Sequence, residues 1–331
     1  MNEFITQISK EEIRLTFLQN DKNISWRLQD LYIDYLKAYF NNSRFEDLSF
    51  KINFSDNLVI FPITLEIRNE NEKFLNYYGD YIDFFYKKIP KAEEQEVIYN
   101  YFDYLINKYQ VKNLKIKIKQ IDYKFNREPL YTTELDSVLK QININLNLSL
   151  EEILNNFTSG LRNVLKKDYP VLHYEVIDKN NYTEGDMSRM QKLHLEVSGY
   201  KTRSDLTWLI NERMILDNLG FLVRVKAYDK IISYNFFIHD KITCSHHSSC
   251  TYREFFKEYR NITYKSLFLA MKYLKNANKC NNFFIGYKTI FSTKQLSQKE
   301  KDIEFFKERF SKKGDIYYCY SNLKKNIFKF N

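Results

Sequence analysis

Three strand-like segments follow one another between residues 221 and 250 with almost nothing between them. The segments read FLVRVKAY, IISYNFFIH and ITCSHHSSC, and they are separated only by Asp229-Lys230 and Asp240-Lys241. Connections this short leave room for hairpins alone, because parallel neighbours need a crossover of about a dozen residues or more. The sequence therefore predicts an antiparallel meander, and the rest of the chain must be arranged around it.

Helical and strand patterns flank this meander on both sides. Capping-box pairs at Ser149/Glu152 and Ser297/Glu300 predict two helix starts, and Ser204 is the expected cap of a third helix. Before the meander we expect an extended segment near 133–147, a helical stretch at 149–169, a strand at 171–177, and helices near 184–197 and 204–218. After it we expect a helix at 262–279, a strand at 281–287, the Ser297 helix, and strands at 315–320 and 326–330.

The first half of the chain shows a shorter version of the same order. We expect a strand at 13–19, a helix at 26–42, a strand pair at 47–54 and 57–67, a helix at 92–110 and a strand at 113–121. A chain of 331 residues is long enough for two medium domains. We therefore predict an α/β (α+β) protein with an N-terminal domain at 1–132 and a C-terminal domain at 133–331 that carries the active site.

Charge and composition limit the class of protein. The 51 basic and 42 acidic residues give a net charge of +9, which permits a polyanionic ligand such as tRNA, coenzyme A or a nucleotide sugar. We do not treat the 27 Tyr and 27 Phe as a nucleic-acid signal, and we expect no DNA partner. The sequence shows neither a membrane span nor a signal peptide, so we expect a cytoplasmic protein. The four cysteines form no C-x-x-C motif, and we expect no disulfides.

The order of elements in the second half is that of the GNAT acyltransferase fold. Within it, FTSGLRNVLKKDYPVLHYEVID, LHLEVSGYKTRSDLTWLINERMI, FFIGY and KDIEFFKERFSKKG resemble successive landmarks of the FemAB-like aminoacyl and acyl transferases. The resemblance implies two GNAT-like domains, each a mixed, mainly antiparallel sheet flanked by helices. It also implies attack by a substrate amine on an activated carbonyl, with no permanently bound cofactor and with aminoacyl-tRNA or acyl-CoA as the donor.

Two groups of site residues follow from this resemblance. The family motif I-x-x-F-K-x-x-F matches Ile303, Phe306, Lys307 and Phe310, which implies that Lys307 contacts the donor or the tetrahedral intermediate and that Phe306 contacts substrate. The family's T-R-S signature falls on Thr202–Ser204, so that Thr202, Arg203 and Ser204 are implied in substrate binding. The sequence departs from the family after Phe310, where SKKG replaces a common Gly-Gly turn.

The residues themselves leave two interpretations of each group open. Ile303, Phe306 and Phe310 lie on one helical stripe and should be core. Beside such a stripe, Lys307 can either extend to solvent or stabilise an oxyanion. Lys201 and Arg203 can grip a phosphate at the start of the helix that Ser204 caps, or they can lie in an ordinary solvated loop.

The strand at 242–250 is the expected wall of the reaction site. Strict alternation puts Cys244, His246, Ser248 and Cys250 on one face and His247 on the other. Either histidine has a suitable ordinary pKa for a general base, although adjacent histidines can also be simply one exposed and one packed. Ligands spread over residues 244 to 250 span about 20 Å of strand, so we expect no metal site.

Glycine is absent from residues 221 to 285, where enzymes that use acyl-CoA carry a loop for the pyrophosphate. We therefore favour a FemAB-like transferase that moves an aminoacyl or acyl group onto an amine of a cell-envelope or surface-glycan precursor, with tRNA or a nucleotide sugar as ligand. One alternative is an acyl-CoA-dependent N-acyltransferase acting on a nucleotide amino-sugar. Another is a non-catalytic GNAT-like binding module. The sequence does not specify an oligomeric state.

Overall fold

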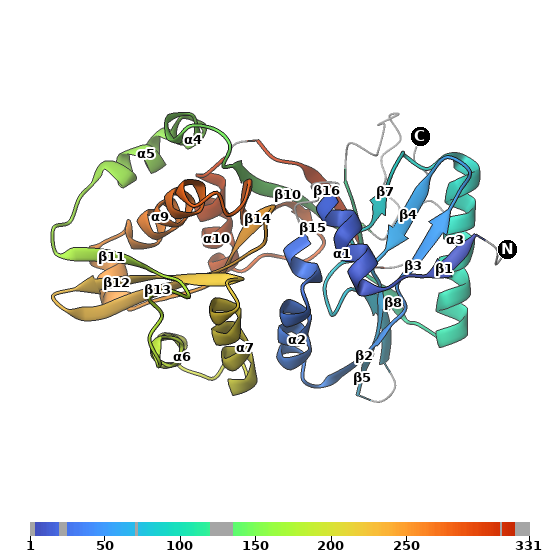
Figure 1. Cartoon of the computed structure of the whole chain (residues 1–331), viewed down its shortest axis with the longest axis horizontal. Helices are drawn as coiled ribbons and strands as arrows, with labels where there is room; N and C mark the ends of the chain where they lie inside the picture. Colours follow the sequence, from blue (N-terminus) through green and yellow to red (C-terminus); the bar gives the residue numbers. More distant parts are fainter. Residues whose placement is uncertain (1–3, 20–24, 70–71, 120–134, 312, 322–331) are drawn as a thin grey trace.

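The computed structural model describes residues 4–19, 25–69, 72–119, 135–311 and 313–321 (Figure 1). Its architecture is mixed α/β with mainly antiparallel sheets, as predicted. The helices are η1 (Ser25–Leu28), α1 (Lys10–Gln19), α2 (Asp30–Tyr39), α3 (Ala92–Tyr109), α4 (Leu150–Asn156), α5 (Ser159–Lys166), α6 (Asp186–Ser198), α7 (Asp205–Leu216), α8 (Arg253–Glu258), α9 (Ile262–Asn276) and α10 (Gln298–Glu308).

An eight-stranded sheet runs through the molecule in the order β11-β12-β13-β14-β15-β10-β16-β9. Its strands are β9 (Ile116–Lys119), β10 (Leu135–Asn145), β11 (Leu172–Ile177), β12 (Gly220–Ala227), β13 (Lys230–His239), β14 (Thr243–Thr251), β15 (Asn282–Ser292) and β16 (Ile316–Tyr320). The predicted meander is β12-β13-β14, and it is antiparallel. Among the described strands of this sheet, β14 and β15 form the one parallel pair.

Two four-stranded sheets build the first half, in the orders β1-β3-β4-β7 and β2-β5-β6-β8. Their strands are β1 (Ile5–Gln7), β2 (Ser43–Asp47), β3 (Phe50–Asn53), β4 (Leu58–Phe61), β5 (Thr64–Arg68), β6 (Glu72–Asn76), β7 (Phe85–Tyr86) and β8 (Asn113–Leu114). The predicted pairing of the segments at 47–54 and 57–67 is confirmed by β3 and β4, while β5 leaves for the other sheet.

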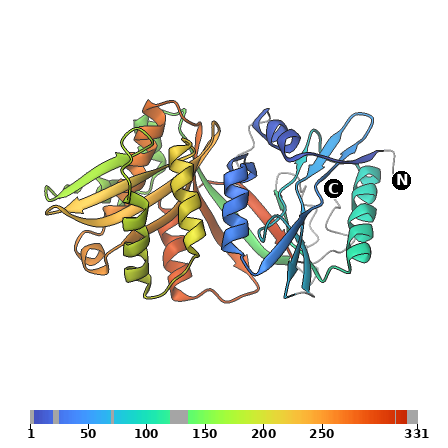
Figure 2. The same ribbon diagram turned by 60° about the horizontal axis from the view of Figure 1, so that its bottom comes forward.

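The two halves are joined by backbone pairing and by side-chain packing. Strand β9, from the first half, pairs with β16 at one edge of the eight-stranded sheet. One hydrophobic cluster also joins α1 and α2 of the first half to α6, α7 and the meander, and α2 lies beside α7 (Figures 1 and 2). The boundary predicted between residues 132 and 133 lies outside the described residues.

The segment at 13–19 is a helix, and the predicted strand is wrong. Ile13 and Phe17 are buried while Leu15 is 45% exposed, so the burial repeats every four residues and not every two. The preceding Ser9 caps this helix by accepting a hydrogen bond from the Glu12 amide at 3.2 Å. Amphipathic packing against the hydrophobic cluster that joins the two halves therefore decides the conformation of a segment whose composition also suits a strand.

Other boundaries differ from the prediction for local reasons. The stretch at 149–169 is two helices, because Thr158 starts a second helix by accepting a hydrogen bond from the Leu161 amide. The predicted helix at 26–42 divides into η1 and α2, and the short helix α8 was not predicted. Both capping boxes are confirmed at the starts of α4 and α10. The strand predicted at 326–330 lies outside the described residues.

Candidate active site

The eight-stranded sheet opens between β14 and β15. These strands pair only along Thr243–Ser245 and Asn282–Phe284, although β14 continues to Thr251 and β15 to Ser292. Beyond this point β14 stays with β13 and β15 stays with β10. Past the fork β14 and β15 no longer pair with each other, and His246 and His247 are the next two residues of β14.

These two histidines lie on opposite faces of the sheet, as strand alternation predicts, and a β-bulge occurs at the same point. Phe236 pairs with Ser248 and Phe237 with His246, so His247 is the extra residue. The His246 ring packs on Phe237, with 5.3 Å between ring centroids, and the His247 ring packs edge-on against Tyr35 of α2 at 4.7 Å. The first half of the chain therefore contributes to the surroundings of His247.

The bulge also overturns the predicted alternation along β14. Cys244 lies in the hydrophobic cluster that contains α9, whereas Cys250 lies in the cluster on the α6 side and its Sγ is 3.7 Å from the Met190 carbonyl oxygen. The extra residue shifts the alternation of side chains by one position. Side chains after the bulge therefore lie on the face opposite to the one that uninterrupted alternation predicts. No group of metal-ligating side chains occurs in the described part of the chain.

Lys307 of α10 reaches over β15 beside the fork. Its Nζ donates a hydrogen bond to the Tyr287 carbonyl oxygen at 2.9 Å. Gly286 makes room for it, since a Cβ there would lie 3.0 Å from Lys307 Cε and 3.1 Å from Nζ, and the backbone φ of +133° also favours glycine. Burial lowers the pKa of Lys307 below its ordinary value, against an opposing effect of Glu304.

On this face of the fork the charge of Lys307 affects the His246 imidazole. Burial, followed by the charge on Lys307, lowers the pKa of His246 to about 4. The neighbouring Phe306 stacks on Tyr264 of α9, with 4.7 Å between centroids, and so fixes α10 against the sheet domain. Phe310 is fully buried as predicted, but Ile303 is 42% exposed and its predicted place in the core is wrong.

Arg203 occupies the opposite face of the fork. Its guanidinium lies over the Trp208 ring, 5.3 Å from the centroid, and its Nη1 is buried without a hydrogen-bond partner among the described residues. Burial and then the charge on Arg203 lower the pKa of His247 to about 3. The Nε2 atoms of both histidines are also buried without a partner in the described part of the structure. Each face therefore combines one cation with one neutral imidazole.

The other residues of the loop before α7 point elsewhere. Lys201 Nζ forms an exposed ion pair with Asp205 at 2.8 Å, and Thr202 Oγ1 lies 3.4 Å from His194 Nδ1. Ser204 is the residue before α7 as predicted, but its hydroxyl donates to the Ala38 carbonyl oxygen of α2 at 3.3 Å and makes no cap hydrogen bond. The loop thus brings Arg203 towards the fork, whereas Lys201 faces solvent. Beside it lies a pocket of about 130 Å³ that Thr202 and Arg203 help to line.

A larger basic pocket lies on the Lys307 side, between α5, α8, α9 and α10. Its volume is about 780 Å³, and its lining includes four cations and one carboxylate: Lys167, Lys257, Arg260, Arg309 and Glu258. Arg309 donates to the Tyr264 hydroxyl at 3.1 Å and stacks over the same ring. The first turn of α9 also borders this pocket, so the site favours a polyanion.

Sequence reasoning missed three contributors to the site. Tyr32 and Tyr35 of α2 pack around His247, and Gly286 provides space for Lys307. The glycine carried a detectable signal, because it interrupts a strand pattern in a chain with only seven glycines. The tyrosines carried none, since only the packing of the two halves brings α2 to the fork.

The lowered pKa values of the two half-buried histidines at the fork predict a loss of stability in acid. Each folded-state pKa lies below the ordinary value of about 6.5, so the unfolded chain takes up protons first as the pH falls. Protonation of these histidines therefore leaves the free energy of unfolding unchanged above about pH 6.5 and lowers it as the pH falls towards 4. We expect His247→Gln to remove about 1 kcal/mol of the stability difference between pH 7.5 and 5.5, measured by urea unfolding. The exposed His173→Gln is the control and should leave the difference unchanged.

The architecture is that of the GNAT fold, with a meander, a parallel β14–β15 fork and helices on both faces. Among solved structures, FemX is similar over 95% of this chain and 96% of its own, with a TM-score of 0.61 and 11% identity. A tandem GNAT protein from the clavulanic acid biosynthesis pathway is similar over 96% and 97%, with a TM-score of 0.53 and 5% identity. L-PGS from Bacillus licheniformis is similar over 95% and 92%, with a TM-score of 0.51 and 13% identity.

These comparisons confirm, at the level of the fold, the FemAB-like tandem GNAT resemblance that the sequence indicated. No family model and no curated protein sequence matches the chain. Within the described residues, none of the helices has both the length and the apolar character needed to cross a bilayer.

Proposed function

We propose that this protein is a transferase that moves an aminoacyl or acyl group onto an amine of a cell-envelope or surface-glycan precursor, in the manner of FemAB-like enzymes. The reaction takes place at the β14–β15 fork, in a C-terminal domain that begins near residue 133. The protein works in the cytoplasm, where aminoacyl-tRNA and nucleotide-linked precursors are available.

One observation carries this proposal, which is the arrangement of two cations around the fork. Lys307 lies on the His246 face, and Arg203 lies on the His247 face. A transferase needs a donor and an acceptor to approach one point from two directions, and a fork in a sheet provides such a point. Buried Nε2 and Nη1 atoms without partners support a polar ligand at this place, because buried polar groups are normally hydrogen-bonded.

The chemistry asked of these residues is modest. The acceptor amine attacks the carbonyl carbon of the donor, a C–N bond forms, and the ester C–O bond to the terminal ribose of tRNA breaks. Lys307 stabilises the oxyanion, and Phe306 supports the donor beside it. His246 or His247 accepts the proton of the attacking amine and passes it to the departing oxygen. Arg203 holds a phosphate of the acceptor, with Lys201, Thr202 and Ser204 around it.

The basic pocket on the Lys307 side supports a large polyanionic donor. Lys167, Lys257 and Arg260 make no ion pair within the described residues, so their charges are available to phosphates. Tyr264 also lines this pocket, where Phe306 stacks on its ring and where its ring and hydroxyl hold Arg309 at the pocket wall. These features favour aminoacyl-tRNA as the donor.

An acyl-CoA donor acting with a nucleotide amino-sugar is the second candidate. The observation that favours it is the position of the basic pocket at the first turn of α9, where helix amides can meet a pyrophosphate. In that case the bond broken is the C–S bond of the thioester, and the thiol leaves with the proton.

Thermal unfolding with a panel of ligands tests both candidates. The panel contains bulk aminoacylated tRNA, acetyl-CoA, free CoA, and UDP- and CMP-linked amino sugars. We expect tRNA and one sugar nucleotide to raise the Tm, and CoA to leave it unchanged. The charge-reversal variant Lys257→Glu/Arg260→Glu should lose the tRNA effect and keep the sugar-nucleotide effect. Stabilisation by CoA alone would replace the first candidate by the second, and RNA binding without transfer of the aminoacyl group would contradict both.

A further inference from the structure

The outer face of α7 is an apolar stripe that no other described part of the chain covers. Leu206, Leu209 and Leu216 are 56%, 61% and 53% exposed, while Trp208 and Met214 face the core. At 100° per residue, the three leucines lie within about 60° of the Leu209 direction. Figure 2 shows α7, in yellow, standing at the front of the molecule beside the blue α2.

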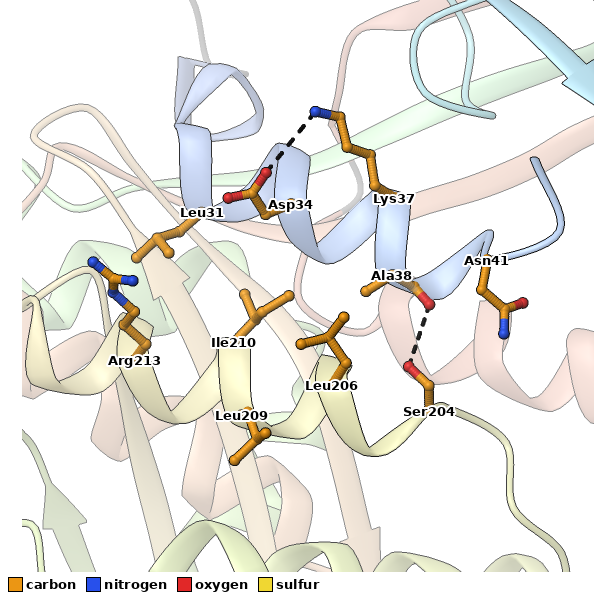
Figure 3. Close-up of a pocket in the computed structure, with 10 residues that line it drawn as sticks. All are labelled: Leu31, Asp34, Lys37, Ala38, Asn41, Ser204, Leu206, Leu209, Ile210 and Arg213. Carbon is orange, nitrogen blue, oxygen red and sulfur yellow. Dashed lines mark hydrogen bonds and ion pairs between the residues drawn. The ribbon is translucent and has the colours of Figure 1, made fainter. Parts of the chain in front are cut away.

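A groove of about 750 Å³ runs along one side of this stripe, between α7 and α2. Leu206 and Ile210 point into it from α7 and Leu31 points into it from α2, whereas Leu209 points away from α2 (Figure 3). The groove is therefore apolar at its centre. An exposed apolar surface of this kind typically marks a place of association.

The charged residues beside the stripe are arranged so that an antiparallel second copy of α7 would present the opposite charge at each position. Asp205 lies four residues before Leu209 and Arg213 lies four residues after it, and their side chains are 68% and 71% exposed. A two-fold axis through Leu209 exchanges these positions, so Asp205 of each copy faces Arg213 of the other. The same axis places Leu206 of each copy on the groove side of the other, so that Leu206 of the second copy enters the groove near Ile210.

We propose that α7 is a self-association surface, on which two copies of this chain pack their α7 helices antiparallel about Leu209. The balance of charges argues against an anionic lipid surface as the occupant, because the three cations around the stripe and groove, Lys37, Lys201 and Arg213, are each paired with an aspartate. A second copy supplies both signs in matching positions. Within the single chain, Arg213 pairs with Asp217 and Asp205 pairs with Lys201. Exposed ion pairs of this kind contribute little free energy, so replacing them by pairs between the two copies costs little.

Cysteine crosslinking tests the position of the axis. All four native cysteines are buried, so an introduced thiol is the accessible one. Leu209→Cys should form a disulfide-linked dimer under mild oxidation, because a residue on the axis meets its own copy. Leu195→Cys is the matched control, since Leu195 is 49% exposed but lies on α6, away from the axis. Equal crosslinking of the two variants would overturn the proposal.

Charge reversal tests the pairing itself. Asp205→Arg and Arg213→Asp should each weaken the dimer about tenfold in sedimentation equilibrium, because like charges then meet across the axis. The double variant restores opposite charges and should restore the dimer, which a merely structural effect of the substitutions would not do. A wild-type protein that stays monomeric at every concentration overturns the proposal, and so does Leu209-dependent binding of that monomer to phospholipid vesicles. These outcomes are independent of transfer activity, so they do not depend on the proposed function.

Discussion

Lys307→Met is expected to lower kcat for group transfer about 100- to 1,000-fold while the protein stays folded. Removing one preorganised donor to an oxyanion typically costs this much. Within the described residues Lys307 forms no ion pair, so its loss leaves no carboxylate buried and unpaired. The amine lost is the one that lies beside His246 and donates to the Tyr287 carbonyl oxygen. Initial rates with aminoacylated tRNA and a sugar-nucleotide acceptor, together with a thermal melt, measure both effects.

Two further variants make this result specific. Lys301→Met changes an exposed lysine on the same helix and should leave kcat within about twofold. Gly286→Ala leaves the lysine in the sequence but puts a methyl group about 3 Å from its side chain, so it should also lower kcat. If Lys307→Met and Arg203→Ala both keep full transfer activity, the fork is not the reaction site.

Asp186→Ala is expected to lower the free energy of unfolding by about 3–5 kcal/mol. This carboxylate is fully buried at the start of α6, and it accepts hydrogen bonds from Arg189 at 2.9 Å, Arg224 at 2.8 Å and Thr183 at 2.8 Å. Arg224 is on β12, so the network ties α6 to the meander. Its removal leaves a largely buried guanidinium without one of its two carboxylates. Urea unfolding at neutral pH measures the loss.

Asp186→Asn is the informative companion, because the amide oxygen keeps an acceptor while the charge is lost. We expect about half the effect of the alanine variant. Asp302→Ala changes an exposed aspartate on α10 and should cost less than about 0.5 kcal/mol. A loss of that small size for Asp186→Ala would mean that the α6 network does not stabilise the fold.

Much of the architecture could be predicted because its signals are local. Short polar turns fixed the meander as β12-β13-β14, and serine and glutamate three residues apart marked the starts of α4 and α10. Local sequence patterns gave the wrong conformation where the same residues suit both a strand and a helix. Residues 13–19 form a helix because Ile13 and Phe17 are buried in the cluster that joins the two halves while Leu15 is exposed, whereas a strand would place all three side chains on one face.

The candidate site divides in the same way. Lys307, Arg203 and the histidine pair were identified from residue types and from family resemblance, and they lie around one fork in the structure. Their roles stay predictions. Lys201 and Ile303 show the limit, because a pattern of residues does not say which side of a loop or helix meets solvent.

By itself, the sequence determined the antiparallel meander and the helix starts at Ser149 and Ser297, and it supplied the candidate residues for acyl transfer. These depend on interactions within a few residues, which a linear pattern records. Only the tertiary structure decided that Cys250 lies on a different face of the sheet from Cys244, because the bulge exists only in the pairing of β14 with β13. It also decided that α2 packs against His247, since contacts between segments some 200 residues apart depend on how whole sheets and helices pack together.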